Sequence, residues 1–72
     1  MGKETLKNRL KVARAERNLS QEELARLVGV TRQTISSIET GQYCPSALLA
    51  FQLAKKLEKA VDELFFLDGD EQ

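Results

Sequence analysis

Apolar residues recur along this chain mostly at the three- and four-residue spacing of amphipathic helices. Leu6, Leu10 and Ala13 form one such stripe, which predicts a first helix from about Thr5 to Arg17. We find no sustained alternation of apolar and polar residues anywhere, so no strand is expected. The predicted fold class is therefore all-α, with five short helices.

The second and third helices have well-marked ends. Ser20-Gln21-Glu22-Glu23 has the form of a capping box, and Gly29 is suited to ending the helix that follows it. Thr31 is a good N-cap for a third helix from Arg32 to about Thr40. Its apolar edge is Ile35 and Ile38, and its end is marked by Gly41.

The fourth helix is expected to begin near Pro45, with a stripe made of Ala50, Leu53, Ala54 and Leu57. A short fifth helix is expected from about Val61 to Phe66, with Leu64 and Phe65 in the core. The chain between them contains Glu58-Lys59, which leaves open whether these two helices are continuous.

The second and third helices together fit a helix-turn-helix at about residues 20–40. Ala25 is small enough for a close helix crossing, and Gly29 can adopt the turn conformation four residues later. This arrangement turns one polar face outward, made of Arg32, Gln33, Ser36 and Ser37. A helix fits the major groove of DNA, where Arg and Gln make bidentate contacts with guanine and adenine. Arg32 and Gln33 are the predicted readers, whereas Ser36 and Ser37 could contact either DNA or water.

The stretch LSQEELARLVGVTRQTISSIETGQYCPS closely resembles the DNA-binding domain of the phage-repressor helix-turn-helix family (Cro/cI-like, or XRE). The likeness continues through ALLAFQLAKKLEKAVDELF and implies a lambda-repressor-like fold that binds double-stranded DNA. It also implies that Gln21 clamps a phosphate, in agreement with the preference of helix N-termini for anions. It implies an internal ion pair between Arg14 and Glu39, with Arg14 also near a phosphate. The remaining positions that would face DNA are Thr31, Arg32, Gln33, Thr34, Ser36, Ser37, Gln42 and Tyr43.

This sequence departs from the family pattern at two places. Members often carry Lys or Arg in the loop after the third helix, where Gln42-Tyr43-Cys44 is uncharged here. Members also often have Gly-Val where this chain has Glu58-Lys59.

Composition bounds the remaining possibilities. At 72 residues the chain is expected to form one domain, residues 1–72, without a separate effector domain. It has no histidine and a single cysteine, Cys44, so neither an internal disulfide nor a Cys/His zinc site can form. Since no nucleophile–base constellation or other cofactor motif is visible, an enzyme is not expected. Without a signal-peptide pattern or membrane-length apolar run, the protein is expected to be cytoplasmic, and associated with the nucleoid when bound to DNA.

Charge is unevenly distributed along the chain. The 11 basic and 11 acidic residues cancel, but residues 1–60 carry 11 basic and 6 acidic groups, a balance of +5. Residues 61–72 carry five acidic groups and no basic one, and they include an acidic tail at 68–72. Exposed charges are screened beyond ~8 Å at physiological salt, so a locally positive body can still attract DNA.

Phe65, Phe66 and Leu67 form an apolar run that a short helix cannot bury on one face. Such a run predicts a dimer interface, with burial within the chain's own domain as the alternative. A homodimer would read a palindromic operator with half-sites ~34 Å apart. The sequence therefore predicts a DNA-binding regulator, expected to be a repressor. The alternative is an antitoxin-like protein-interaction module on the same fold, with weak or no DNA binding.

Overall fold

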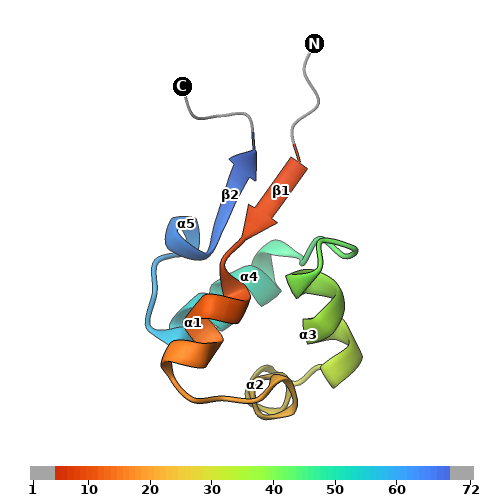
Figure 1. Ribbon diagram of the computed structural model, residues 1–72, viewed down its shortest axis with the longest axis vertical. Helices are drawn as coiled ribbons and strands as arrows, with labels where there is room; N and C mark the ends of the chain where they lie inside the picture. The colour runs from red at the N-terminus through yellow and green to blue at the C-terminus, as the bar shows by residue number, and fades with distance from the viewer. Residues whose placement is uncertain (1–4, 69–72) are drawn as a thin grey trace.

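The computed structural model describes residues 5–68, which form a helical body with a pair of strands projecting from one end (Figure 1). The helices surround a common core, and the strand pair lies at the opposite end of the molecule from α2. In chain order the elements are β1 (Thr5–Asn8), α1 (Leu10–Glu16), α2 (Gln21–Val28), α3 (Arg32–Glu39), α4 (Ala47–Leu57), α5 (Val61–Leu64) and β2 (Phe65–Asp68).

The N-terminal segment corrects the all-α prediction. Residues 5–8 are a strand, and the first helix is limited to Leu10–Glu16. β1 pairs antiparallel with β2, with Leu6 opposite Leu67 and Asn8 opposite Phe65. Leu6 and Asn8 are half-buried while their strand neighbours are exposed, which is the two-residue period of a strand. The fold is thus mostly helical with a small strand pair.

The predicted end of the fifth helix is also wrong. The helix ends at Leu64, and Phe65 has the extended backbone angles φ −127° and ψ 137°. The carbonyl of Leu64 accepts a 2.8 Å hydrogen bond from the amide of Arg9. This bond lies next to the antiparallel β1–β2 pair, called the ribbon below, and joins the residue after β1 to the residue before β2. Of the acidic tail, Asp68 is the last residue of β2, and 69–72 lie outside the described residues.

The fourth and fifth helices are separate. α4 ends at Leu57, and Glu58 follows in the left-handed conformation with φ 59°. The amide of Lys59 then donates to the carbonyl of Ala54 at 3.0 Å. Glu58 therefore occupies the left-handed position after the helix, which is most often glycine.

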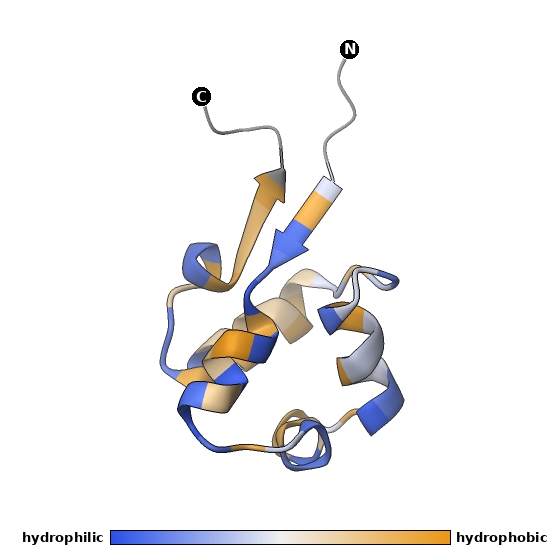
Figure 2. Ribbon diagram, viewed as in Figure 1, coloured by the Kyte–Doolittle hydropathy of each residue, from blue (hydrophilic) through white to orange (hydrophobic). Residues whose placement is uncertain are grey.

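Local signals define the helix-turn-helix. Ser20 and Glu23 form a reciprocal capping box at the start of α2, and Gly29 ends it with φ 76°. Thr31 caps α3, whose buried residues Ile35 and Ile38 face the core. The buried apolar core of the described residues comprises Leu10, Ala13, Leu24, Ala25, Ile35, Ile38, Leu49, Leu53, Ala54, Leu57, Leu64 and Phe65. In Figure 2, which is coloured by hydropathy, the start of α3 is hydrophilic and much of α4 is hydrophobic.

Among residues 5–68, no helix has both the length and the apolar character needed to cross a membrane.

Candidate nucleic-acid interface

The start of α3 presents two long polar side chains to solvent. Arg32 and Gln33 are both exposed, whereas Ile35 and Ile38 hold the opposite side of the helix in the core. The helix is therefore anchored along one face and open along the other. Guanidinium and amide groups on the open face can donate and accept hydrogen bonds at base edges.

The hydroxyl groups near this face are partly committed to the helix itself. Thr31 Oγ1 accepts from the amide of Thr34 at 3.2 Å and lies 3.1 Å from Thr34 Oγ1. Ser36 and Ser37 are half-buried. Thr31 and Thr34 therefore have a local capping role, while Arg32 and Gln33 are the most accessible donors on the helix.

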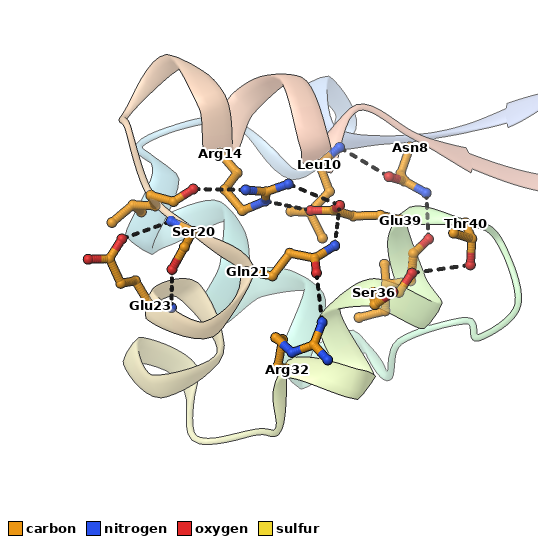
Figure 3. Close-up of polar contacts among 12 residues, drawn as sticks. Asn8, Leu10, Arg14, Ser20, Gln21, Glu23, Arg32, Ser36, Glu39 and Thr40 are labelled. Atoms are coloured by element: carbon orange, nitrogen blue, oxygen red, sulfur yellow. Dashed lines mark hydrogen bonds and ion pairs between the residues drawn. The ribbon is translucent and has the colours of Figure 1, made fainter.

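Arg14 and Glu39 join α1 to the last turn of α3 (Figure 3). Arg14 Nε lies 2.7 Å from Glu39 Oε2, and Arg14 Nη2 lies 3.2 Å from Oε1. A third donor, Arg14 Nη1, bonds to the carbonyl of Leu19 at 2.8 Å. The two side chains are only 14% and 5% exposed, so the guanidinium is held within the protein and orients α3.

Gln21 connects this ion pair to the exposed face of α3. Its Nε2 donates to Glu39 Oε1 at 3.0 Å, and its Oε1 accepts from Arg32 Nη1 at 3.4 Å. A carboxylate can only accept, so Glu39 fixes which end of the Gln21 amide points inward. The side chain of Gln21 thus presents its carbonyl oxygen toward Arg32, and its amide nitrogen is engaged by Glu39 (Figure 3).

The loop after α3 is tied to the helix through its backbone. The carbonyl of Ser37 accepts from the amides of Gln42 and Tyr43 at 2.9 and 3.2 Å. Both loop side chains are exposed. Tyr43 lines a groove of about 540 Å³ between this loop and the β1–β2 ribbon, together with Leu6, Pro45 and Leu67.

The three apolar residues of β2 do not share one surface. Phe65 is 7% exposed and belongs to the core. Phe66 points to the other face of the ribbon, where the guanidinium carbon of Arg9 lies 4.7 Å from the centre of its ring. Leu67 lines the groove beside Tyr43 and is 42% exposed. Burial within the domain therefore accounts for Phe65, and Leu67 has the accessible position next to α3 and its loop.

The acidic residues of α5 lie away from α3. Asp62 and Glu63 are exposed in the first turn of α5, which lies on the far side of the body from α3 (Figure 1). The negative charge of α5 is thus remote from the start of α3.

Asn8 was missed by the sequence reasoning. Its side chain bonds both to α1 and to α3, because Oδ1 accepts from the Leu10 amide and Nδ2 donates to the Ile38 carbonyl. Asparagine side chains often accept from the amide two residues on, so an Asn two residues before Leu10 was a usable signal of a turn before the helix. The predicted helix over residues 5–17 concealed it.

The sequence profile of the helix-turn-helix family, described simply as "Helix-turn-helix", matches residues 10–64. The chain belongs to this family. The match takes in all of α1 to α5 and confirms the resemblance to phage-repressor-like proteins.

Two relatives of the family resemble the chain over nearly its whole length. An uncharacterised HTH-type transcriptional regulator of Methanocaldococcus jannaschii is 48% identical over 66 residues, which are 92% of this chain and 100% of the relative. The uncharacterised HTH-type transcriptional regulator YgzD of Bacillus subtilis is 44% identical over 65 residues, 90% of this chain and 98% of the relative.

A solved member of similar fold is the restriction-modification controller protein C.AhdI from Aeromonas hydrophila. It superposes with a TM-score of 0.72 at 36% identity, covering 76% of this chain and 80% of its own.

Proposed function

We propose that this protein is a sequence-specific DNA-binding transcriptional regulator that acts as a repressor by occupying its operator. The observation that carries the proposal is the exposed pair Arg32 and Gln33 at the start of a core-anchored α3, in a member of the helix-turn-helix family. The two relatives described above are named as HTH-type transcriptional regulators, which supports the same class. The activity is binding alone, in the cytoplasm and on the nucleoid.

In this proposal α3 enters the major groove and Arg32 and Gln33 read base edges. Ser36 and Ser37 assist from the next turn, beside Thr31 and Thr34. Gln21 holds a phosphate through the amides of the first turn of α2, because its side chain is engaged by Glu39 and Arg32. Arg14 chiefly orients α3 and also lies near the DNA backbone. Gln42 and Tyr43 contact that backbone from the loop after α3.

We also propose that two copies join through the ribbon side of the molecule and bind a palindromic operator. The groove beside Leu67 supports this arrangement, because it presents apolar side chains directly next to α3 and its loop. Tyr43 and Leu67 are 48% and 42% exposed there, and a domain of this size gains stability from further apolar burial. Two-fold pairing of such domains would place two α3 helices on successive turns of DNA.

A second candidate function is protein interaction without DNA binding, as in an antitoxin-like module. One observation favours it: the loop Gln42-Tyr43-Cys44 carries no positive charge where a phosphate contact is expected. The exposed side chains of Arg32 and Gln33 can form hydrogen bonds with base edges in the major groove, and this favours the DNA-binding regulator.

Selection of bound sequences from random duplex DNA tests the proposal. We expect enrichment of a palindrome whose half-sites lie about one helical turn apart. Recovery of unrelated sequences by the folded protein, at low as well as at moderate salt, would favour the interaction module instead. Enrichment of a single asymmetric half-site would support sequence-specific DNA binding but would contradict the symmetric dimer.

A further inference from the structure

Asn8 joins three parts of the molecule through one half-buried side chain. It is the last residue of β1, and its Oδ1 accepts from the Leu10 amide at 3.1 Å, which fixes the start of α1. Its Nδ2 donates to the carbonyl of Ile38, in the last turn of α3, at 2.9 Å. The second bond spans 30 residues of sequence and ties the ribbon directly to α3 (Figure 3).

The Asn8 bond complements the Arg14–Glu39 ion pair. The ion pair holds Glu39 to α1, and Asn8 holds the preceding residue, Ile38, to β1. Two adjacent residues at the C-terminal end of α3 are thus tied to two different elements. Because the Ile38 side chain is also fully buried, the end of α3 is fixed in both position and direction.

Asn8 and Ile38 both line the groove between the ribbon and the loop after α3. A body seated in this groove would lie against the hydrogen bond that connects ribbon and helix. A body bound in the groove would therefore contact both partners of the bond that orients α3, the side chain of Asn8 and residue Ile38.

We propose that Asn8 is a positioning residue for DNA recognition. It sets the orientation of α3 relative to the β1–β2 ribbon, and through the ribbon it fixes the distance between the two α3 helices of a dimer. This inference rests on the proposed function, since it requires that α3 reads DNA and that a second copy docks on the ribbon side. It concerns spacing between half-sites, which Arg32 and Gln33 do not determine.

Two substitutions separate the bonds of Asn8. Asn8→Ser keeps a hydroxyl that can accept from the Leu10 amide but is too short to reach Ile38. Asn8→Asp keeps the acceptor and the length but places a carboxylate against the Ile38 carbonyl. Gln52→Glu makes the same amide-to-acid change at an exposed position of α4, beside Lys55 and Lys56, and serves as the charge control.

The measurement compares affinity for duplexes carrying the selected palindrome with its original spacer and with one base pair inserted or removed. We expect the wild type and Gln52→Glu to discriminate strongly among these spacers. In Asn8→Ser and Asn8→Asp, loss of a hydrogen bond should weaken binding to the original duplex by about three- to tenfold. The affinities of these variants for duplexes with the original and the altered spacers should also become more alike. The ratio between spacers does not depend on the folded fraction, so simple destabilisation would leave it unchanged.

Spacer discrimination equal to the wild type in both Asn8 variants would overturn the inference. Arg32→Ala, assayed on single-base variants of the same palindrome, distinguishes this result from failure of the proposed function. If Arg32→Ala loses sequence preference while the Asn8 variants match the wild type, α3 reads DNA and Asn8 does not position it. If Arg32→Ala and the Asn8 variants all match the wild type, both the proposed reader and the inference are rejected.

Discussion

Gln21 donates a 3.0 Å hydrogen bond to Glu39, and this contact determines the direction of its side-chain amide. The carboxylate requires the nitrogen end, so the carbonyl oxygen faces the guanidinium of Arg32 at 3.4 Å. A buried acidic group thereby influences an exposed cation without touching it. Glu39 thus has a structural role, orienting Gln21, beside a surface that is proposed to bind DNA.

Glu39→Gln should destabilise the fold. The substitution replaces the carboxylate partner of a largely buried Arg14, and hydrogen bonds to charged groups contribute ~1.5–3 kcal/mol each. We expect the free energy of unfolding in urea to fall by about 2–3 kcal/mol. Glu22→Gln is the control, because its ion pair with Arg26 is exposed and 3.7 Å long. A similar loss in both variants would show that burial of the Arg14–Glu39 pair is not the cause.

Arg32→Ala should relax the base preference at one operator position per half-site. A residue that reads a base edge contributes ~1–3 kcal/mol of discrimination there. The measurement is repeated selection of bound DNA, with binding titrations against single-base variants. Arg26→Ala is the control, because it also removes one positive charge, from an exposed position on α2. Equal weakening on all sequences in Arg32→Ala would identify this residue as a phosphate contact instead.

Leu67→Glu should dissociate the proposed dimer. The new carboxylate would lie in the groove beside Tyr43, where burying a charge without a partner is unfavourable. Sedimentation equilibrium should show the wild type as a dimer at micromolar concentration and the variant as a monomer. Leu48→Glu, on α4, is the control because Leu48 is 69% exposed outside the groove. Dissociation by Leu48→Glu alone would move the interface from the ribbon to α4.

Glu58→Gly should stabilise the protein. Glu58 has φ 59°, and the left-handed conformation costs ~1–2 kcal/mol for a residue with a side chain. Its ion pair with Arg17 is exposed and contributes ~0–1 kcal/mol. The net gain in urea unfolding is expected to be about 0.5–1 kcal/mol. Asn18→Gly, at φ 58°, should gain less, because asparagine tolerates this conformation. Loss of stability in Glu58→Gly would mean that the ion pair outweighs the strain.

Acid should weaken the start of α2. The Ser20 amide donates to Glu23 at 2.8 Å, and this bond lowers the pKa of the Glu23 carboxyl below its ordinary value of 4.5. A lowered folded-state pKa stabilises the fold when the group is ionised, above the ordinary value. That stabilisation is lost as pH falls through the lowered value. Melting temperatures from about pH 7 to 3 should therefore depend less on pH in Glu23→Gln. Glu22→Gln removes a neighbouring carboxylate outside the capping box and is the control; an equal change of slope in both variants would exclude the capping box as the source.

The helix-turn-helix was predictable because its ends are encoded locally. The capping box at Ser20 and the turn at Gly29 each depend on residues within one helical turn. The expected start of α3 at Arg32 is confirmed, and its end at Glu39 lies one residue before the expected one. The outward direction of Arg32 follows from Ile35 and Ile38 on the opposite side.

The strand pair was not predictable from helical spacing. Leu6 lies four residues before Leu10, so the two resemble one helix stripe, yet Leu6 pairs with Leu67 at the other end of the chain. A strand of four residues gains its stability from that distant partner, which a local pattern cannot reveal. The same error hid Asn8, and the contact between Gln21 and Glu39 depends on packing of three separate helices.

Pairing of β1 with β2 has a consequence for how the protein is made. β1 leaves the ribosome before its partner, which is residues 65–68, so the ribbon cannot close until that second strand has also emerged. Contacts of this separation form slowly because the intervening chain must first be ordered. A polypeptide ended before Phe65 would lack the strand that pairs with β1. It would leave apolar surface open to proteases and chaperones, so interrupted translation would yield material for degradation rather than a shortened competitor for DNA.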